Sequence, residues 1–183
     1  MTPLYVVLIC FALIALLVAI SYNGLVRLRN KVEEAWRDVD VQLQRRHDLI
    51  PRLVEVVKGY AAHESTLFEE LTRLRSEAEV AQGADAKGEP EARLAGAIGR
   101  AVVVAESYPT LRASESFLSL QKEIAETEDE IAASRDIYND NVRIYDSRIQ
   151  SFPVSYYADL FGFEPAAFFQ ADADERESVP MPV

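Results

Sequence analysis

The sequence opens with a stretch, Met1 to Val26, that contains no Asp, Glu, Lys, Arg or His. Within it, LYVVLICFALIALLVAI is an unbroken apolar run from Leu4 to Ile20. A helix needs about 20 such residues to cross the ~30 Å hydrocarbon core of a bilayer, and Tyr22 follows where interfacial aromatic residues are enriched. The sequence therefore predicts that residues 1–26 form a single-pass transmembrane anchor.

Two other interpretations of this run are less favoured. A secretory signal peptide needs a basic start and a small-x-small cleavage site, but residues 1–6 contain no Lys or Arg and no such site follows the run. A lipoprotein signal would place a small residue before its cysteine, whereas Ile9 precedes Cys10. We therefore expect Cys10, the only cysteine, to be a lipid-facing apolar residue of a retained anchor.

Basic residues follow the anchor directly. Four of them lie within about 15 residues of its end, at Arg27, Arg29, Lys31 and Arg37. The excess of positive charge on this side predicts that the domain after the anchor lies in the cytoplasm.

The rest of the chain has the periodicity of long helices, so the predicted fold class is all-α. In the first tract, residues 25–82, apolar residues recur at spacings of three, four or seven, as in a coiled coil: Val32, Trp36, Val39, Leu43, Ile50, Leu53, Val57 and Tyr60. The segment 83–91, GADAKGEPE, has the composition of a loop. A shorter helix follows and ends at Tyr108–Pro109, because the residue before proline avoids the α region.

A further helical tract is expected from Ser114 to Ser151. Its apolar seam comprises Phe117, Leu120, Ile124, Ile131, Tyr138, Val142, Tyr145 and Ile149. Thr127 and Ser134 interrupt this seam, and small polar residues at such positions usually form register-setting polar layers. The alternative is a groove for a partner helix or a ligand.

After the break at Phe152–Pro153, the segment 154–169 is dense in aromatic residues. We expect it to return onto the bundle. Docking on the membrane surface is less favoured, because no basic face accompanies the aromatic residues. Residues 171–183 are predicted to be a disordered acidic tail. The predicted domains are thus the anchor 1–26, an elongated antiparallel bundle of three to four helices over 27–170, and this tail.

Composition and motifs exclude several classes of function. The net charge is −11 and the isoelectric point is near 4.7, which argues against nucleic-acid binding. The sequence has no phosphate-binding loop, dinucleotide fingerprint, zinc-protease motif, CxxC or nucleophile elbow. We therefore assign no catalytic, cofactor-binding or metal-binding residue, and expect no cofactor.

The two histidines are the remaining candidates for chemistry. His47–Asp48 and His63–Glu64 each place a carboxylate beside an imidazole. On one helix, however, His47 and His63 would lie ~24 Å apart and ~160° around the axis. They cannot share one metal ion, whose histidine ligands lie ~2 Å away.

Pro51 and Arg46 make the same stretch unusual. Proline removes a helical hydrogen bond to the carbonyl of His47, so a kink or a break is expected, with Asp48 able to cap a new helix start. Arg46 occupies a seam position beside it. We expect its side chain to extend out to solvent along its methylenes; pairing with an acid on another helix is the alternative.

The order of motifs resembles the LemA family of bacterial membrane proteins. The resemblance rests on YNGLVRLRNKVEEAWRDVDVQLQRRHDLIPRLVEVVKGYAAHE (residues 22–64), on residues 108–153, and on LFGFEPAAFF (160–169). It implies one amino-terminal transmembrane helix, an antiparallel helical bundle, location in the bacterial inner membrane, and no known enzymatic activity. Some relatives carry lipoprotein-type signals, from which this chain departs.

Three functions remain open at this stage. The favoured one is a non-enzymatic, membrane-anchored scaffold or accessory protein that binds a partner protein through its bundle. The others are an enzyme with a cryptic carboxylate or histidine site, and a structural membrane protein that self-associates into a homo-oligomer.

Overall fold

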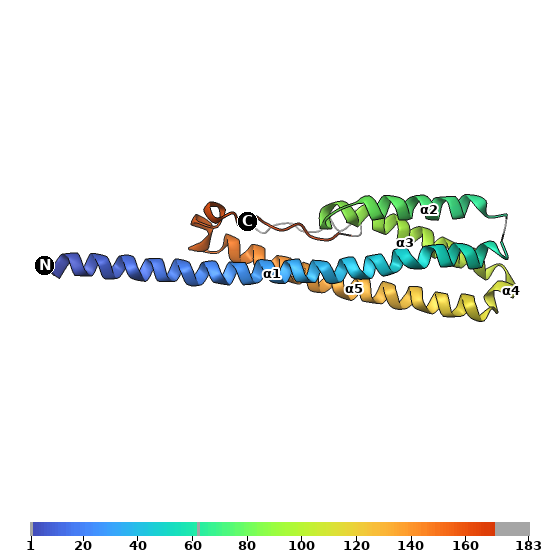
Figure 1. Ribbon diagram of the computed structural model, residues 1–183, viewed down its shortest axis with the longest axis horizontal. Coiled ribbons are helices and arrows are strands. Elements are labelled where there is room, and N and C mark those ends of the chain that lie inside the picture. Colours follow the sequence, from blue (N-terminus) through green and yellow to red (C-terminus); the bar gives the residue numbers. More distant parts are fainter. Residues whose placement is uncertain (1, 62, 171–183) are drawn as a thin grey trace, which may run out of the picture.

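The computed structural model describes residues 2–61 and 63–170 and consists of helices joined by short turns. In chain order the elements are α1 (Thr2–Lys58), α2 (Ser65–Val80), α3 (Ala84–Glu106), α4 (Pro109–Arg112), α5 (Glu115–Gln150), and the 3-10 turns η1 (Val154–Tyr156) and η2 (Asp159–Phe161). No strand occurs in the described part of the chain, which confirms the all-α prediction. Figure 1 shows a rod in which α1 and α5 lie side by side, with the α2–α3 hairpin beside them at the end away from the amino terminus.

Helix α1 is both the apolar run and the first helix of the bundle. Its 57 residues correspond to a length of about 85 Å, and its amino-terminal third projects beyond the other helices (Figure 1). The large apolar side chains from Leu4 to Ile20 are exposed, and the first core residue of α1 is Leu25. Among the helices of the described residues, α1 is the one that is long and apolar enough to span a membrane.

The bundle contains two hydrophobic cores stacked along its axis. The core nearer the apolar run is formed mainly by α1, α5 and the carboxyl-terminal segment, including Leu25, Val39, Tyr138 and Phe163, with Ala84 of α3 at its edge. The core at the far end is formed by all five helices, including Leu53, Leu71, Leu94 and Phe117. Complete burial of such a side chain contributes about 1.5–3 kcal/mol each, so both cores stabilise the long α1–α5 pair.

A buried polar layer separates the two cores. Among the described residues, the buried polar or charged ones are Arg46, His47, Glu91 and Thr127. On α1 they lie between the core residues Leu43 and Leu49, and on α5 Thr127 lies between Ile124 and Ile131. Of the two predicted polar-layer positions, Thr127 is buried at this level, where its hydroxyl donates to the Glu123 carbonyl of its own helix at 2.7 Å, whereas Ser134 is only half-buried.

The first helical tract differs from the sequence-based expectation in two ways: no break occurs at Pro51, and the helix ends at Lys58, well before residue 82. Helix α1 continues through Pro51 without a break and ends at Lys58, where Gly59 and Tyr60 turn the chain. Asp48 accordingly caps no helix; it accepts a 3.0 Å hydrogen bond from Gln44. Tyr60, predicted as a seam residue, is exposed in the turn.

The segment expected to be a loop, 83–91, is also helical. Helix α3 begins at Ala84, directly after Gly83, whose φ of 81° reverses the chain. The helix forms because one face of this polar segment is buried: Ala84, Gly88 and Glu91 lie inside, in line with Leu94. The predicted helix end before Pro109 and the tract from Ser114 to Ser151 agree with α3 and α5 within a few residues.

Residues 164–170 form an extended strap that runs along α5 and reaches Gly88 of α3; we call it the C-terminal strap. Asn139 of α5 binds the backbone of Phe169 twice, accepting from its N–H at 3.0 Å and donating to its carbonyl at 3.1 Å. Tyr138 donates to the carbonyl of Ala167 at 2.6 Å. The side chain of Phe169 packs on Trp36 of α1, with ring centroids 5.7 Å apart. The expectation that the aromatic segment returns onto the bundle is thus confirmed for the strap. The predicted acidic tail, 171–183, lies outside the described residues.

We expect Gly88→Ala to loosen the strap. A Cβ at Gly88 would overlap the backbone carbonyl of Gln170, which cannot yield as a flexible side chain would. Gly99→Ala on the same helix is the matched control, since its Cβ would meet nothing within 4 Å, and it should stabilise by up to ~1 kcal/mol through helix propensity. Thermal unfolding in detergent should show a lower midpoint for Gly88→Ala and a higher one for Gly99→Ala. Equal midpoints for the two variants would contradict close packing at Gly88.

Candidate functional site

The polar layer is the only place where buried charged side chains of the described residues meet. Arg46 comes from the seam of α1 and exposes 3 % of its surface. One end of its guanidinium, Nη1, donates to both carboxylate oxygens of Glu128 on α5, at 3.0 and 3.1 Å. The other end, Nη2, forms a close ion pair with Glu91 of α3 and also donates to the Glu91 carbonyl at 3.3 Å. The expectation that Arg46 extends to solvent is therefore wrong: the alternative, pairing with acids on other helices, is what the fold adopts.

His47 completes the layer from the neighbouring position on α1. Its Nε2 lies 2.8 Å from Oε1 of Glu91, and both side chains are 2 % exposed. Because a carboxylate accepts hydrogen bonds, Nε2 carries the proton and donates. Glu91 therefore receives a donor on each oxygen, one from His47 and one from Arg46.

The carboxyl group of Glu91 is ionised in this setting. Burial by itself would raise the pKa of Glu91, but the His47 hydrogen bond and the charge of Arg46 together outweigh it and hold the pKa below its ordinary value. Paired and hydrogen-bonded charges are the form in which ionised groups are tolerated in a protein interior. The layer thus ties α1, α3 and α5 together through charge-assisted hydrogen bonds, which are the stronger class.

A small cavity adjoins the layer. It has a volume of about 120 Å³ and lies between Arg46, Glu91, Glu128 and Phe169 of the strap, with alanines of α3 and α5 on its wall. Two buried nitrogens, Nε of Arg46 and Nδ1 of His47, make no hydrogen bond within the described residues. The described protein groups therefore do not satisfy the full hydrogen-bonding capacity of Arg46 and His47.

The charged groups of the layer bind one another and thereby align α1, α3 and α5. No group of three or more His, Cys, Asp or Glu residues that could hold a metal is found among the described residues. Cys10 lies in the apolar run, far along α1 from the layer. The layer therefore combines one arginine, one imidazole and two carboxylates, which bind one another.

The remaining sequence candidates are dispersed. His63 is exposed in the turn between α1 and α2, and Asp48 is exposed on α1. The structure therefore does not bring the two histidines together, in agreement with the helix geometry. Sequence reasoning missed Glu91, because its segment has the composition of a loop. The signal was present, however: Glu91, Leu94 and Ile98 have the spacing of one buried helical face.

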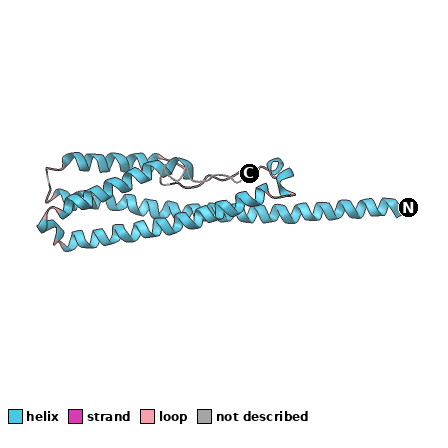
Figure 2. Ribbon diagram, turned by 180° about the vertical axis from the view of Figure 1, so that it is seen from behind, coloured by secondary structure: helices cyan, strands magenta, loops and turns pink. Residues whose placement is uncertain are grey.

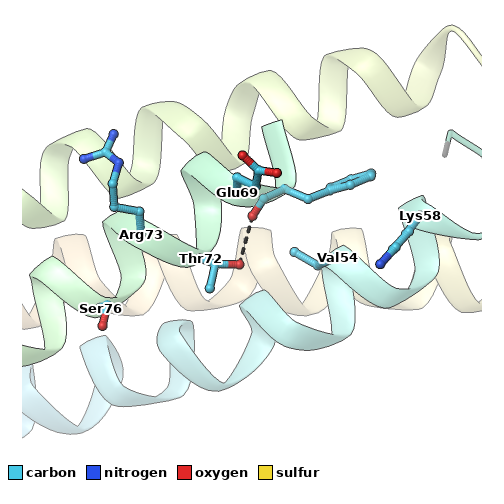
Figure 3. Close-up of a pocket in the computed structure, with 7 residues that line it drawn as sticks. Val54, Lys58, Glu69, Thr72, Arg73 and Ser76 are labelled. Atoms are coloured by element: carbon cyan, nitrogen blue, oxygen red, sulfur yellow. Dashed lines mark hydrogen bonds between the residues drawn. The ribbon is translucent and has the colours of Figure 1, made fainter. Parts of the chain in front are cut away.

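A groove lies between α1 and α2, near the far end of the rod. It has a volume of about 630 Å³ and is lined by Val54, Lys58, Phe68, Glu69, Thr72, Arg73 and Ser76. The Thr72 hydroxyl donates a 2.8 Å hydrogen bond to the backbone carbonyl of Phe68, drawn as a dashed line in Figure 3. Arg73 is paired with Glu77 of its own helix. The groove offers surface for contact rather than a convergent set of reactive groups.

Comparison with known proteins gives a consistent family. A family model described as the LemA family matches residues 35–181. The magnetosome proteins MamQ 1 and MamQ 2 of Paramagnetospirillum magneticum are 29 % identical over 175 residues, covering 81 % of this chain and 64 % of each relative. Protein LemA of Metamycoplasma hominis is 27 % identical over 158 residues, covering 86 % of this chain and 72 % of that protein. The chain thus spans a little under two thirds of the length of the MamQ proteins. None of these names denotes an enzyme.

We expect Glu91→Gln to destabilise the fold and to flatten its pH dependence. Breaking a buried ion pair costs up to about 3–5 kcal/mol. The pKa of Glu91 is lower in the fold than its ordinary value of ~4.3. Ionised Glu91 therefore stabilises the fold at pH values above ~4.3. This stabilisation is lost as the pH falls through the lowered pKa. The free energy of unfolding in detergent, measured from about pH 3 to 7, should therefore fall less steeply with acid in Glu91→Gln than in the parent protein.

Glu89→Gln is the matched control for that measurement. Glu89 lies on the same helix, its side chain is 82 % exposed, and its one recorded ion pair, with Arg93, is 3.9 Å long. Exposed pairs contribute about 0–1 kcal/mol, so this variant should retain the parent profile. An unchanged profile in Glu91→Gln as well would contradict a stabilising, ionised Glu91.

Proposed function

The chain belongs to the LemA family, and we propose that it is a membrane-anchored, non-enzymatic scaffold or accessory protein that binds partner proteins through its helical bundle. The observation that carries the proposal is the continuity of α1. One helix, Thr2–Lys58, contains the exposed apolar run and one face of both cores. A partner held by the bundle would therefore be held at a fixed distance and direction from the membrane.

The polar layer supports a scaffold role over an enzymatic one. Its charged groups bind one another across three helices, and its adjoining cavity of about 120 Å³ is well below the 300–1,000 Å³ of ordinary ligand pockets. Its residues fix the bundle, which leaves exposed surfaces such as the α1–α2 groove for partners.

We further propose that the membrane is the bacterial inner membrane and that the bundle lies in the cytoplasm. The support is the set of basic residues that follows the apolar run, Arg27, Arg29, Lys31 and Arg37, since such residues are enriched on the cytoplasmic side. A phosphatase reporter fused at Val183 should be inactive. Reporter activity characteristic of an extracytoplasmic location would contradict this orientation.

The partner-binding proposal is tested by site-specific photocrosslinking in native membranes. A photoreactive residue at Thr72 or Ser76, both exposed in the α1–α2 groove, should give discrete crosslinked bands that are the same in repeated experiments. The same residue at Lys122 of α5, whose side chain is 77 % exposed, is the control for nonspecific capture. Bands absent from both groove positions, or identical to those from Lys122, would contradict a partner surface in this groove.

A further inference from the structure

Large apolar side chains remain exposed where the chain leaves α5. Phe152, Tyr156 and Leu160 expose 80 %, 82 % and 83 % of their surfaces, although they belong to a described, turn-rich segment. We call residues 152–163 the aromatic collar. Its other face is well packed, because Val154, Ala158 and Phe163 are buried in the core beside α1. The exposed side chains are therefore held outward by a folded segment.

The collar lies beside α1 at the carboxyl end of the apolar run. Tyr22 makes edge-to-face contacts with both Phe161 and Phe163, with ring centroids 5.4 Å apart in each case. Gly162, at a φ of 73°, turns the chain between them, so that Phe161 stays exposed while Phe163 is buried under the guanidinium of Arg29. Figures 1 and 2 both show this segment next to α1, where the projecting part of the helix leaves the bundle.

This position coincides with the border of a bilayer spanned by α1. The run from Leu4 to Ile20 would cover about 25 Å as a helix, close to the thickness of a hydrocarbon core. Tyr22 and the collar then lie at the interface, the level at which Trp and Tyr are enriched. Basic residues follow within the next turns of α1, with Arg27 and Arg29 exposed, and the collar itself contains one acid, Asp159.

A groove connects the collar to the apolar run. It has a volume of about 540 Å³ and is lined by Phe161 together with α1 residues that include Phe11, Ile14, Val18 and Tyr22. It therefore extends from the collar toward the part of α1 assigned to the membrane. An occupant of this groove must be apolar, and in a bilayer the molecules present at that depth are lipid acyl chains.

We propose that the aromatic collar is a second membrane contact, in which Tyr156, Leu160 and Phe161 enter the headgroup–acyl boundary and a phospholipid acyl chain fills the groove beside α1. The collar is anchored to the same core as α1 and α5, so it holds the bundle at a fixed tilt to the bilayer. The sequence alone favoured no membrane docking, because the collar lacks a basic face of its own. The fold supplies that charge from α1. The proposal depends on the membrane anchoring in the proposed function.

The test uses the full chain in phosphatidylethanolamine–phosphatidylglycerol vesicles and nitroxide labels on single cysteines. Cys10→Ala provides the background for Tyr156→Cys and Leu160→Cys, and for Val103→Cys on α3. Val103 is 65 % exposed at a position outside both the collar and the apolar run, and is the matched aqueous control. The collision rates of each label with oxygen, which concentrates in lipid, and with a water-soluble nickel chelate report its depth.

We expect the ratio of oxygen to nickel collisions to be several-fold higher at Tyr156 and Leu160 than at Val103. Ratios equal to that of Val103 would overturn the proposal. So would labels at Tyr156 and Leu160 that are protected from both reagents, since that result would mean that protein, such as a second copy of the chain, covers the collar.

A label on the native Cys10 of the parent protein distinguishes failure of the collar from failure of the anchor. Cys10 is exposed within the apolar run. A lipid signature at Cys10 with an aqueous one at Leu160 would overturn the collar alone. An aqueous signature at Cys10 would overturn the anchoring on which both proposals depend.

Discussion

The pairing of Arg46 with Glu91 and Glu128 is the interaction on which the arrangement of the long helices depends. It connects α1 to α3 and α5 at one level of the rod, with His47 as the second donor to Glu91. Buried ion pairs add little net stability compared with well-packed apolar residues. Their better-attested effect is to specify register, because any sliding of one helix leaves a buried charge without its partner. A long rod with continuous apolar seams has many near-equivalent registers, and the layer selects one of them.

The layer also divides the molecule into parts with different surroundings. On one side, α1, α5, the aromatic collar and the C-terminal strap form the core nearest the apolar run. On the other side, the α2–α3 hairpin adds two helices and produces the wider core. The strap reaches the layer itself, since Phe169 lines the cavity beside Arg46. The aromatic collar, proposed to contact lipid, and the α1–α2 groove, proposed to contact a partner protein, therefore lie on opposite sides of the layer along α1.

Much of the fold follows from local pattern, and the exceptions have identifiable causes. The seams of α1 and α5 were predicted correctly apart from Tyr60, which is exposed, because a period near 3.6 residues is a direct record of burial. Pro51 was expected to kink or break α1; no break occurs, because its cost of about 3 kcal/mol is offset by the burial of Leu49, Ile50 and Leu53 around it. The segment 83–91 has the composition of a loop, yet it is helical because Ala84, Gly88 and Glu91 form a buried face in line with Leu94. Arg46 could be recognised as unusual from its seam position, whereas its partners lie 45 and 82 residues away; nothing in a local pattern identifies contacts at that separation.

A double-mutant cycle on Arg46 and Glu91 measures the central interaction most directly. The free energies of unfolding of the parent protein, Arg46→Met, Glu91→Gln and the double variant would be compared in the same detergent. If the two side chains act as one unit, removing the second costs little once the first is gone, and the coupling energy should be at least about 1 kcal/mol, within the range for residues in contact. Costs that add to within about 0.5 kcal/mol, as for independent sites, would contradict the role assigned to the polar layer.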